Sequence, residues 1–218
     1  MELLLQFADL ILHLDVHLDA LIRDYGAWVY GILFVIIFVE TGLVVMPFLP
    51  GDSLLFIAGA FGATGALSLP LLIGLLILAA IAGNTSNYWV GRAVGPRVFQ
   101  WENSRFFNRN AFDKAHAFYE KHGAITIVAT RFLPILRTFS PFVAGVAAMR
   151  HARFQLYNIT GGVLWVAGLS LAGYWFGNIP WVKNNLTLII LALIIIPGLP
   201  ALVVAAKEWR AARGRAGK

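Results

Sequence analysis

The stretch ETGLVVMPFLPGD, from Glu40 to Asp52, places two carboxylates on either side of a proline-containing break in an otherwise apolar segment. A second stretch, RFLPILRTFSP from Arg131 to Pro141, places two arginines around a similar break. A charged side chain at bilayer depth costs roughly 2.5–3.5 kcal/mol on insertion scales. We therefore expect the two acids and the two arginines to face one another, water or a ligand in one shared, roughly neutral site.

The composition indicates a membrane protein. Of the 218 residues, 59% are hydrophobic and only 13% are charged, whereas a soluble domain has about 25% charged residues. Arg23 is the only Lys or Arg among the first 91 residues, and this asymmetry indicates membrane orientation rather than a surface for nucleic acid. The chain has no cysteine, which excludes disulfides, thiolate metal sites and cysteine nucleophiles. The N-terminus lacks the basic region of a signal peptide.

The apolar segments predict an all-α membrane protein. A break by proline leaves pieces shorter than the roughly 20 residues that cross a bilayer, so we expect re-entrant hairpins at about 27–62 and 123–148. Uninterrupted spans are expected at about 66–90, 154–177 and 186–206. The N-terminal segment 1–24 has the spacing of an amphipathic helix that lies at the interface or packs beneath the bundle. Lys and Arg in 91–122, 149–153 and the tail 207–218 predict that these segments are cytoplasmic.

The two broken segments also suggest an internal repeat. Both contain Phe-Leu-Pro, at 48–50 and 132–134, and each is followed by a full span. The predicted topology opens one hairpin outward and the other inward. In an inverted repeat of this kind, broken helices meet near the bilayer midplane and form the substrate site.

Glu40 and Asp52 are the candidates for proton coupling. Burial favours the neutral carboxylic acid, whereas a neighbouring guanidinium favours the carboxylate. A group held between these two influences could take up and release a proton. The alternative is that both acids only pair with the arginines and hold the hairpins together. Asp52 also follows a glycine and precedes Ser53, a pattern typical of a helix N-cap.

Arg131 and Arg137 are the candidates for binding substrate. Guanidinium presents a fixed fork of donors that suits phosphate, and it does not deprotonate, so it cannot carry the proton. The alternative is that the two arginines only balance the acids. A phosphate clamp and a structural balance are both compatible with the spacing.

Four further polar residues are candidates for contact with substrate, and these are Thr138, Asn84, Asn87 and Tyr88. The two asparagines share one helical face, which suits a pathway or hydrogen bonds between helices. Thr138 could equally satisfy backbone groups that the prolines free. All five histidines lie in peripheral segments, so we expect neither a metal site nor a cofactor, and we do not expect an enzyme.

Several motifs together resemble those of the DedA family of bacterial inner-membrane proteins, which carry the VTT, or SNARE-associated, domain and have eukaryotic relatives that move lipids across ER membranes. The resemblance covers roughly residues 25–206. Its motifs are Glu40-Thr-Gly42, Pro47-x-x-Pro50-Gly51-Asp52, Gly83-Asn84 with Tyr88 and Gly91-Arg92, and Arg131-Phe-x-Pro134-x-x-Arg137-Thr138 followed by Ala144-Gly145. Many members have an acid where Asn84 stands here.

The resemblance implies two opposed re-entrant hairpins in a multi-pass protein of the bacterial inner membrane, with its C-terminus in the cytoplasm. It implies a flippase for an anionic lipid carrier, most plausibly undecaprenyl phosphate, driven by the proton-motive force. The expected partners are membrane lipids, the lipid-phosphate substrate and protons, and a homo-oligomer is an open alternative to a monomer. Two other functions stay open: a small-ion or drug/proton antiporter, and a membrane assembly factor that transports nothing.

Overall fold

The computed structural model describes residues 14–43, 51–98, 125–131, 133–193 and 195–196. Within these ranges every regular element is a helix and there is no strand. The helices are α2 (Leu14–Tyr25), α3 (Trp28–Gly42), α4 (Gly51–Ala63), α5 (Leu69–Val98), α7 (Ile125–Thr130), α8 (Pro134–Val146), α9 (His151–Phe176) and α10 (Pro180–Asn184). Residues 186–193 and 195–196 are also helical. The all-α prediction is confirmed for the described part of the chain.

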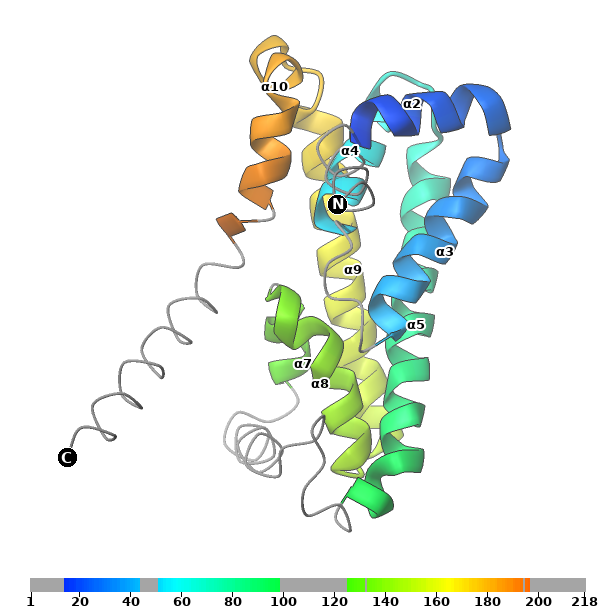
Figure 1. Ribbon diagram of the computed structural model, residues 1–218, viewed down its shortest axis with the longest axis vertical. Helices are drawn as coiled ribbons and strands as arrows, with labels where there is room; N and C mark the ends of the chain where they lie inside the picture. Colours follow the sequence, from blue (N-terminus) through cyan, green and yellow to red (C-terminus); the bar gives the residue numbers. More distant parts are fainter. Residues whose placement is uncertain (1–13, 44–50, 99–124, 132, 194, 197–218) are drawn as a thin grey trace, which may run out of the picture.

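Two long helices, α5 and α9, run from one end of the molecule to the other (Figure 1). Leu69–Gly95 and His151–Phe176 are long and apolar enough to cross a membrane, and they coincide with two of the three predicted spans. The third predicted span, 186–206, lies mostly outside the described residues. Helix α5 continues beyond the predicted end at residue 90, and there Gly95 packs closely against Val146 of α8.

The two broken segments form short helices. Helix α3 has 15 residues and α4 has 13, so neither reaches the length of about 20 residues that a span needs. Helix α7 ends after six residues, and α8 starts at Pro134, a position where proline is favoured because its missing N–H would be unpaired there anyway. The predicted turn at 44–50 lies outside the described residues.

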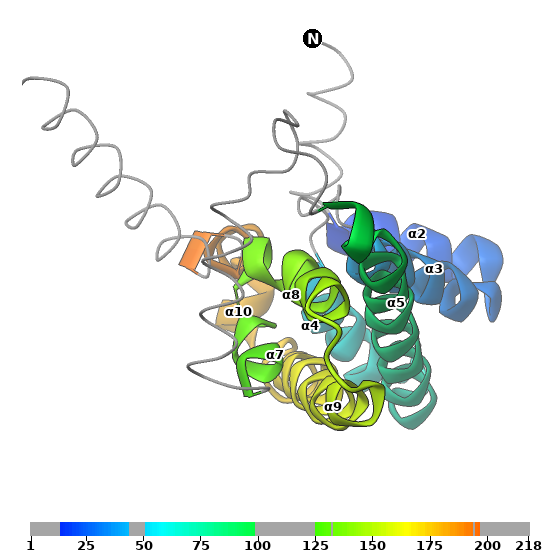
Figure 2. The same cartoon turned by 90° about the horizontal axis from the view of Figure 1, so that it is seen from below.

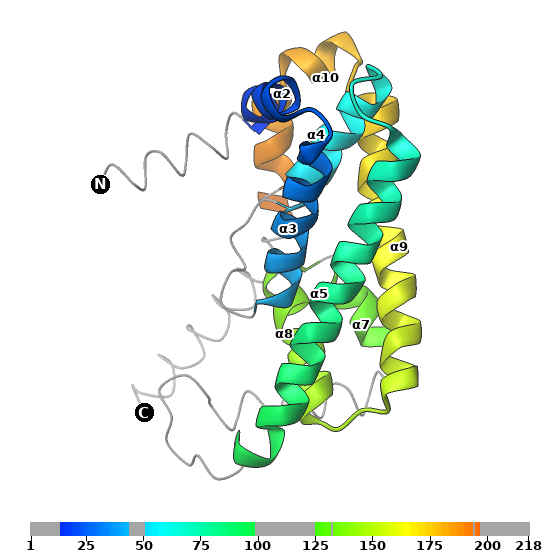
Figure 3. The ribbon, with the colours of Figure 1, turned by 90° about the vertical axis from the view of Figure 1, so that its right-hand side faces the viewer.

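The short helices occupy opposite halves of the molecule. Figure 1 shows α3 and α4 along the upper half of α5 and α9, and α7 and α8 along the lower half. Helices α3 and α8 pack on α5, while α4 and α7 pack on α9. Figures 2 and 3 show the same neighbours from two further directions. The ends of the broken helices therefore lie near the middle of the long ones.

Four glycines allow the backbones of these helices to touch. A Cβ at Gly59 of α4 would overlap the carbonyl oxygen of Ser170, and one at Gly173 of α9 would overlap that of Phe56. The crossing of α5 with α8 is built in the same way. There Gly91 faces the carbonyl of Phe142, and Gly145 faces that of Tyr88. Small residues at such positions let membrane helices approach closely, and Gly173 has this role in the packing of α9 on α4.

We predict that Gly91→Val destabilises the protein by about 1–3 kcal/mol, because added volume at a tight crossing forces the helices apart. The matched control is Gly74→Val in the same helix, since a Cβ at Gly74 would meet nothing within 4 Å. Thermal unfolding of both variants in detergent measures the difference. Equal unfolding temperatures for the two variants would mean that the α5–α8 crossing tolerates added volume.

Helix α2 lies across the upper end of the molecule (Figure 1). Leu14 and Leu18 are buried, whereas Asp19 and Arg23 form an exposed ion pair of 2.7 Å. This division between two faces agrees with the predicted amphipathic character. The part of that prediction covering residues 1–13 lies outside the described residues.

Candidate functional site

Arg137 joins the two halves of the molecule. Its Nη1 lies 2.8 Å from Oδ1 of Asp52, and its Nη2 pairs with Oε1 of Glu40. The side chains of Arg137 and Glu40 are almost completely buried, and that of Asp52 is 17% exposed. The convergence expected from the sequence is therefore present for these three residues, and one cation serves two carboxylates.

The local chain path explains why these three side chains meet. Glu40 lies in the last turn of α3, Asp52 in the first turn of α4, and Arg137 in the first turn of α8. The Glu40 carboxylate rests on Gly51, where any Cβ would overlap it. Glycine at position 51 thus leaves the room that the carboxylate occupies.

Trp165 of α9 contacts Asp52 and both arginines. Its Nε1 donates a hydrogen bond of 2.8 Å to Oδ1 of Asp52. The Arg137 Cζ lies 4.7 Å from the centre of the indole ring, and the Arg131 Cζ lies 6.0 Å from it. A desolvated guanidinium over an indole ring is stabilised by about 2 kcal/mol or more. The sequence analysis did not single out Trp165.

We predict that Trp165→Phe destabilises the protein by about 1.5–3 kcal/mol, because phenylalanine keeps a ring under the arginines but loses the hydrogen bond to the Asp52 carboxylate. Trp175→Phe, in the exposed part of the same helix, is the control and should stay within about 0.5 kcal/mol of the parent. Unfolding in detergent distinguishes them. If both variants unfold like the parent, the Trp165–Asp52 contact contributes no stability.

Arg131, in contrast, has no carboxylate partner among the described residues. Its Nη2 donates to Oδ1 of Asn158 at 2.5 Å and to the Asn158 carbonyl at 3.2 Å. Its Nε and Nη1 have no hydrogen-bond partner within the described structure, although the side chain is only 1% exposed. The guanidinium lies against Gly161 and Gly162 of α9, and a side chain at either position would crowd it.

Asparagines tie this part of the site to the long helices. Asn84 of α5 donates to Oδ1 of Asn158 at 3.1 Å, and Asn158 in turn donates to the carbonyl of Ile81. Asn87 donates to the carbonyl of Thr138 at 2.6 Å. The structure thus brings Asn84 to the Asn158 that holds Arg131, and Asn87 to the residue next to Arg137. Asn158 was missed in the sequence analysis.

Tyr88 belongs to a neighbouring cluster. Its hydroxyl donates to the carbonyl of Met149 at 2.5 Å and accepts from Arg92 at 2.9 Å, and its ring stacks on Phe154. Tyr88 lies about one helical turn of 5.4 Å after Asn84 along α5. The contacts seen for Tyr88 therefore do not include either of the two central arginines.

The arrangement suits the binding of an anion. Arg137 forms ion pairs with two carboxylates, whereas Arg131 is buried and two of its own nitrogens, Nε and Nη1, have no hydrogen-bond partner in the described structure. A buried cation without an anionic partner is costly, and an anionic ligand that accepts from both nitrogens would remove that cost. Among the described residues, no three His, Asp or Glu side chains gather closely enough to hold a metal ion.

The chain is similar to known membrane proteins. Residues 49–175 match the model of the VTT domain family. The chain is 50% identical to Protein DedA of Escherichia coli over 214 residues, which cover 97% of this chain and 98% of the relative. It is 46% identical to an uncharacterized membrane protein of Mycobacterium tuberculosis, covering 87% and 84% of the two chains. It is 39% identical to the inner membrane protein YqjA of Escherichia coli, covering 69% of each. No solved structure matches it.

Proposed function

This chain belongs to the DedA family of VTT-domain membrane proteins, and on that premise we propose that it moves a phosphate-bearing lipid across the bacterial inner membrane. The observation that carries the proposal is Arg131, a buried guanidinium whose Nε and Nη1 have no partner in the described structure. A lipid phosphate could accept from these nitrogens while its tail stays in the bilayer. Undecaprenyl phosphate fits best, because its head group offers only phosphate oxygens.

The packing of the helices supports an inverted repeat of α3–α5 and α7–α9. The main packing partners correspond between the two sets: α3 packs on α5 as α7 packs on α9, and α4 packs on α9 as α8 packs on α5. The two glycine crossings, α4 with α9 and α8 with α5, also have the same geometry. In each crossing, a glycine of one helix faces a backbone carbonyl of the other helix, three residues before that helix's own glycine. Gly59 thus faces Ser170, three residues before Gly173, and Gly173 faces Phe56, three residues before Gly59. Such repeats place the substrate site between their broken helices.

Glu40 and Asp52 give the site a way to couple transport to protons. Both acids form ion pairs with Arg137. In our proposal, protonation of Glu40 removes one of these two ion pairs, and Arg137 becomes available to join Arg131 on the phosphate. Release of the proton returns Arg137 to Glu40 and weakens the hold on the phosphate. The site would thereby bind a proton and the substrate together and release them together with each change of state.

The proposal is tested by reconstituting the purified chain in liposomes with labelled undecaprenyl phosphate and following the exposure of its head group. We expect protein-dependent movement that increases with a pH gradient. Labelled undecaprenol is the control because it has the same tail without phosphate. Equal movement of both lipids would contradict phosphate recognition at Arg131, and movement insensitive to pH would contradict the coupling through Glu40.

A small-ion or drug/proton antiporter is the second candidate, and the buried Glu40 favours it because its Oε2 has no partner in the described structure. Such an antiporter needs the acid but not Arg131. In proteoliposomes without lipid phosphate, it would move a soluble cation against protons, and Arg131→Gln would leave that flux intact. The same preparation thus separates the two candidates.

A further inference from the structure

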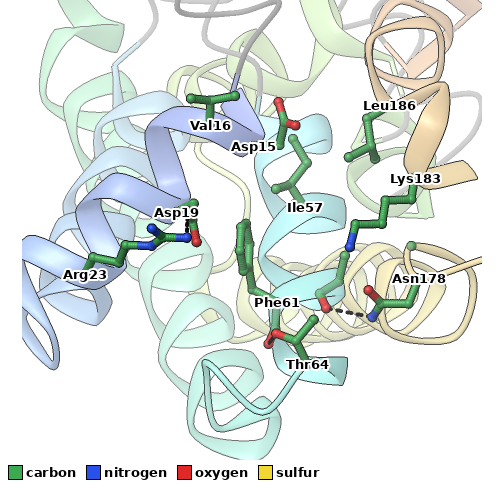
Figure 4. Close-up of a pocket in the computed structure, with 12 residues that line it drawn as sticks. Asp15, Val16, Asp19, Arg23, Ile57, Phe61, Thr64, Asn178, Lys183 and Leu186 are labelled. Carbon is green, nitrogen blue, oxygen red and sulfur yellow. Dashed lines mark hydrogen bonds and ion pairs between the residues drawn. The ribbon is translucent and has the colours of Figure 1, made fainter.

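A second polar site lies at the upper end of the molecule, far along α4 and α9 from the arginines. Here α2, α4, α10 and the end of α9 enclose a cavity of about 370 Å³, hereafter the end cavity (Figure 4). Its walls include Asp15, Arg23 and Lys183. Both α2 and α10 lie outside the matched VTT domain at 49–175, so the family domain alone does not form this cavity.

The charges of the end cavity are divided between two walls. On α2, Asp19 is already paired with Arg23 at 2.7 Å. Asp15 on the same helix and Lys183 on α10 have no ion pair in the described structure, and both line the cavity; Figure 4 shows Asp15 above Ile57 and Lys183 near Leu186. The end cavity therefore offers one free carboxylate and one free ammonium group, on opposite walls.

The remaining lining is apolar. Ile57 and Phe61 of α4 form the floor, and Leu186 lies beside Lys183. A ligand that fits must carry a positive group for Asp15, a negative group for Lys183 and an apolar part for this floor. A purely anionic or purely cationic ligand would satisfy only one of the two walls.

We propose that the end cavity binds a zwitterionic head group, with an amine on Asp15 and a phosphate on Lys183. An ammonium group can donate hydrogen bonds to the carboxylate, and a phosphate oxygen can accept from lysine. This site is separate from the central one, because none of Glu40, Asp52 and the two arginines lines it. The inference does not rest on the proposed transport function, because it involves neither Arg131 nor Arg137.

The test is binding of dihexanoyl phosphatidylethanolamine to the purified full-length chain in detergent, measured by native mass spectrometry. We expect Asp15→Asn and Lys183→Gln each to weaken binding about tenfold, as loss of one charged hydrogen bond implies. Dihexanoyl phosphatidylglycerol has the same chains without the amine and should bind more weakly to the parent. Equal binding of the two lipids, or unchanged binding by both variants, overturns the proposal.

A charge-swapped variant, Asp15→Lys with Lys183→Asp, tests whether the positions of the two charges matter. The exchange keeps one negative and one positive side chain in the cavity, so binding that needs only the presence of both charges would be retained. In a lipid head group the phosphate is attached to the glycerol and the amine lies beyond it, so this order is fixed. In the swapped variant the amine would face a lysine and the phosphate would face an aspartate. We therefore expect the swap to lose binding as fully as the single changes, and retained binding overturns the proposal.

Soluble glycerophosphoethanolamine identifies the source of the head group. If it binds as tightly as the short-chain lipid, the ligand is a soluble zwitterion of the same chemistry. If only the lipid binds, the apolar floor at Ile57 and Phe61 takes part and the ligand is a membrane lipid. Arg153→Gln serves as the reference variant, because the exposed Arg153 lines neither the end cavity nor the central site, and this variant should bind phosphatidylethanolamine like the parent.

Discussion

Replacing Arg137 with glutamine is expected to destabilise the protein by about 3–5 kcal/mol, because it leaves the buried Glu40 and Asp52 without a cation. The exposed Arg153 provides the control, and Arg153→Gln should change the free energy of unfolding by less than about 0.5 kcal/mol. Chemical unfolding in detergent measures both variants. The loss should also appear as weaker packing between α3, α4 and α8, since Arg137 is the residue whose ion pairs join all three.

A double-mutant cycle isolates the ion pair itself. Glu40→Gln combined with Arg137→Gln removes both charges, so the double variant should be more stable than Arg137→Gln alone. Residues in direct contact typically couple by about 0.5–3 kcal/mol, and we expect the upper part of this range for so buried a pair. Strict additivity of the two changes would show that Glu40 and Arg137 do not interact in the folded protein.

Replacing Arg131 with glutamine should have a different effect from replacing Arg137. We expect the protein to keep its stability and to lose its affinity for the ligand. Arg131 has no carboxylate partner in the described structure, so removing its charge leaves no buried acid uncompensated, and stability should be unchanged or raised. Glutamine cannot offer a phosphate two charged donors. Since hydrogen bonds to charged groups contribute about 1.5–3 kcal/mol each, binding of lipid phosphate should weaken by roughly a hundredfold or more.

The measurement is the shift in unfolding temperature when undecaprenyl phosphate is added, because a ligand that binds only the folded state stabilises it. The parent protein should be stabilised and Arg131→Gln should not. Undecaprenol, added to both, corrects for the effect of the tail. If Arg131→Gln unfolds far below the parent without any ligand, Arg131 is a structural residue and its free nitrogens do not await an anion.

The sequence predicts where the helices are broken and that the charges beside the breaks lie close together, because both follow from local chemistry. Proline disrupts a helix interior, and a charge within an apolar segment is costly unless a partner, water or a ligand compensates it. The meeting of Glu40 and Asp52 with Arg137 was therefore predictable. Spacing from the prolines did not reveal which arginine pairs with the acids, because Arg131 and Arg137 both flank Pro134.

Trp165 and Asn158 were missed because their importance depends on which face of α9 is turned inward. A signal was present, since Asn158, Gly161, Gly162 and Trp165 recur at three- and four-residue spacing and form one face of a helix. All four are buried in the structure. A stripe of polar, small and aromatic residues within an otherwise apolar span indicates a surface that receives other side chains rather than lipid.

Tyr88 illustrates the limit of spacing along one helix. It lies four residues after Asn84 and therefore on the same face, which suggested a shared role. The crossing of α5 with α8, where Gly91 and Gly145 meet the facing backbone, places Tyr88 among Phe154, Arg92 and Met149 instead. The position of that crossing follows from packing between segments far apart in sequence.

The account depends on a lipid phosphate using the free guanidinium of Arg131 as it crosses the membrane. The most direct measurement is the rate at which labelled undecaprenyl phosphate changes leaflets in liposomes that contain equal amounts of folded parent protein or Arg131→Gln. We predict rapid, protein-dependent movement with the parent and movement near the protein-free rate with the variant. Equal rates for the two proteins would contradict the account.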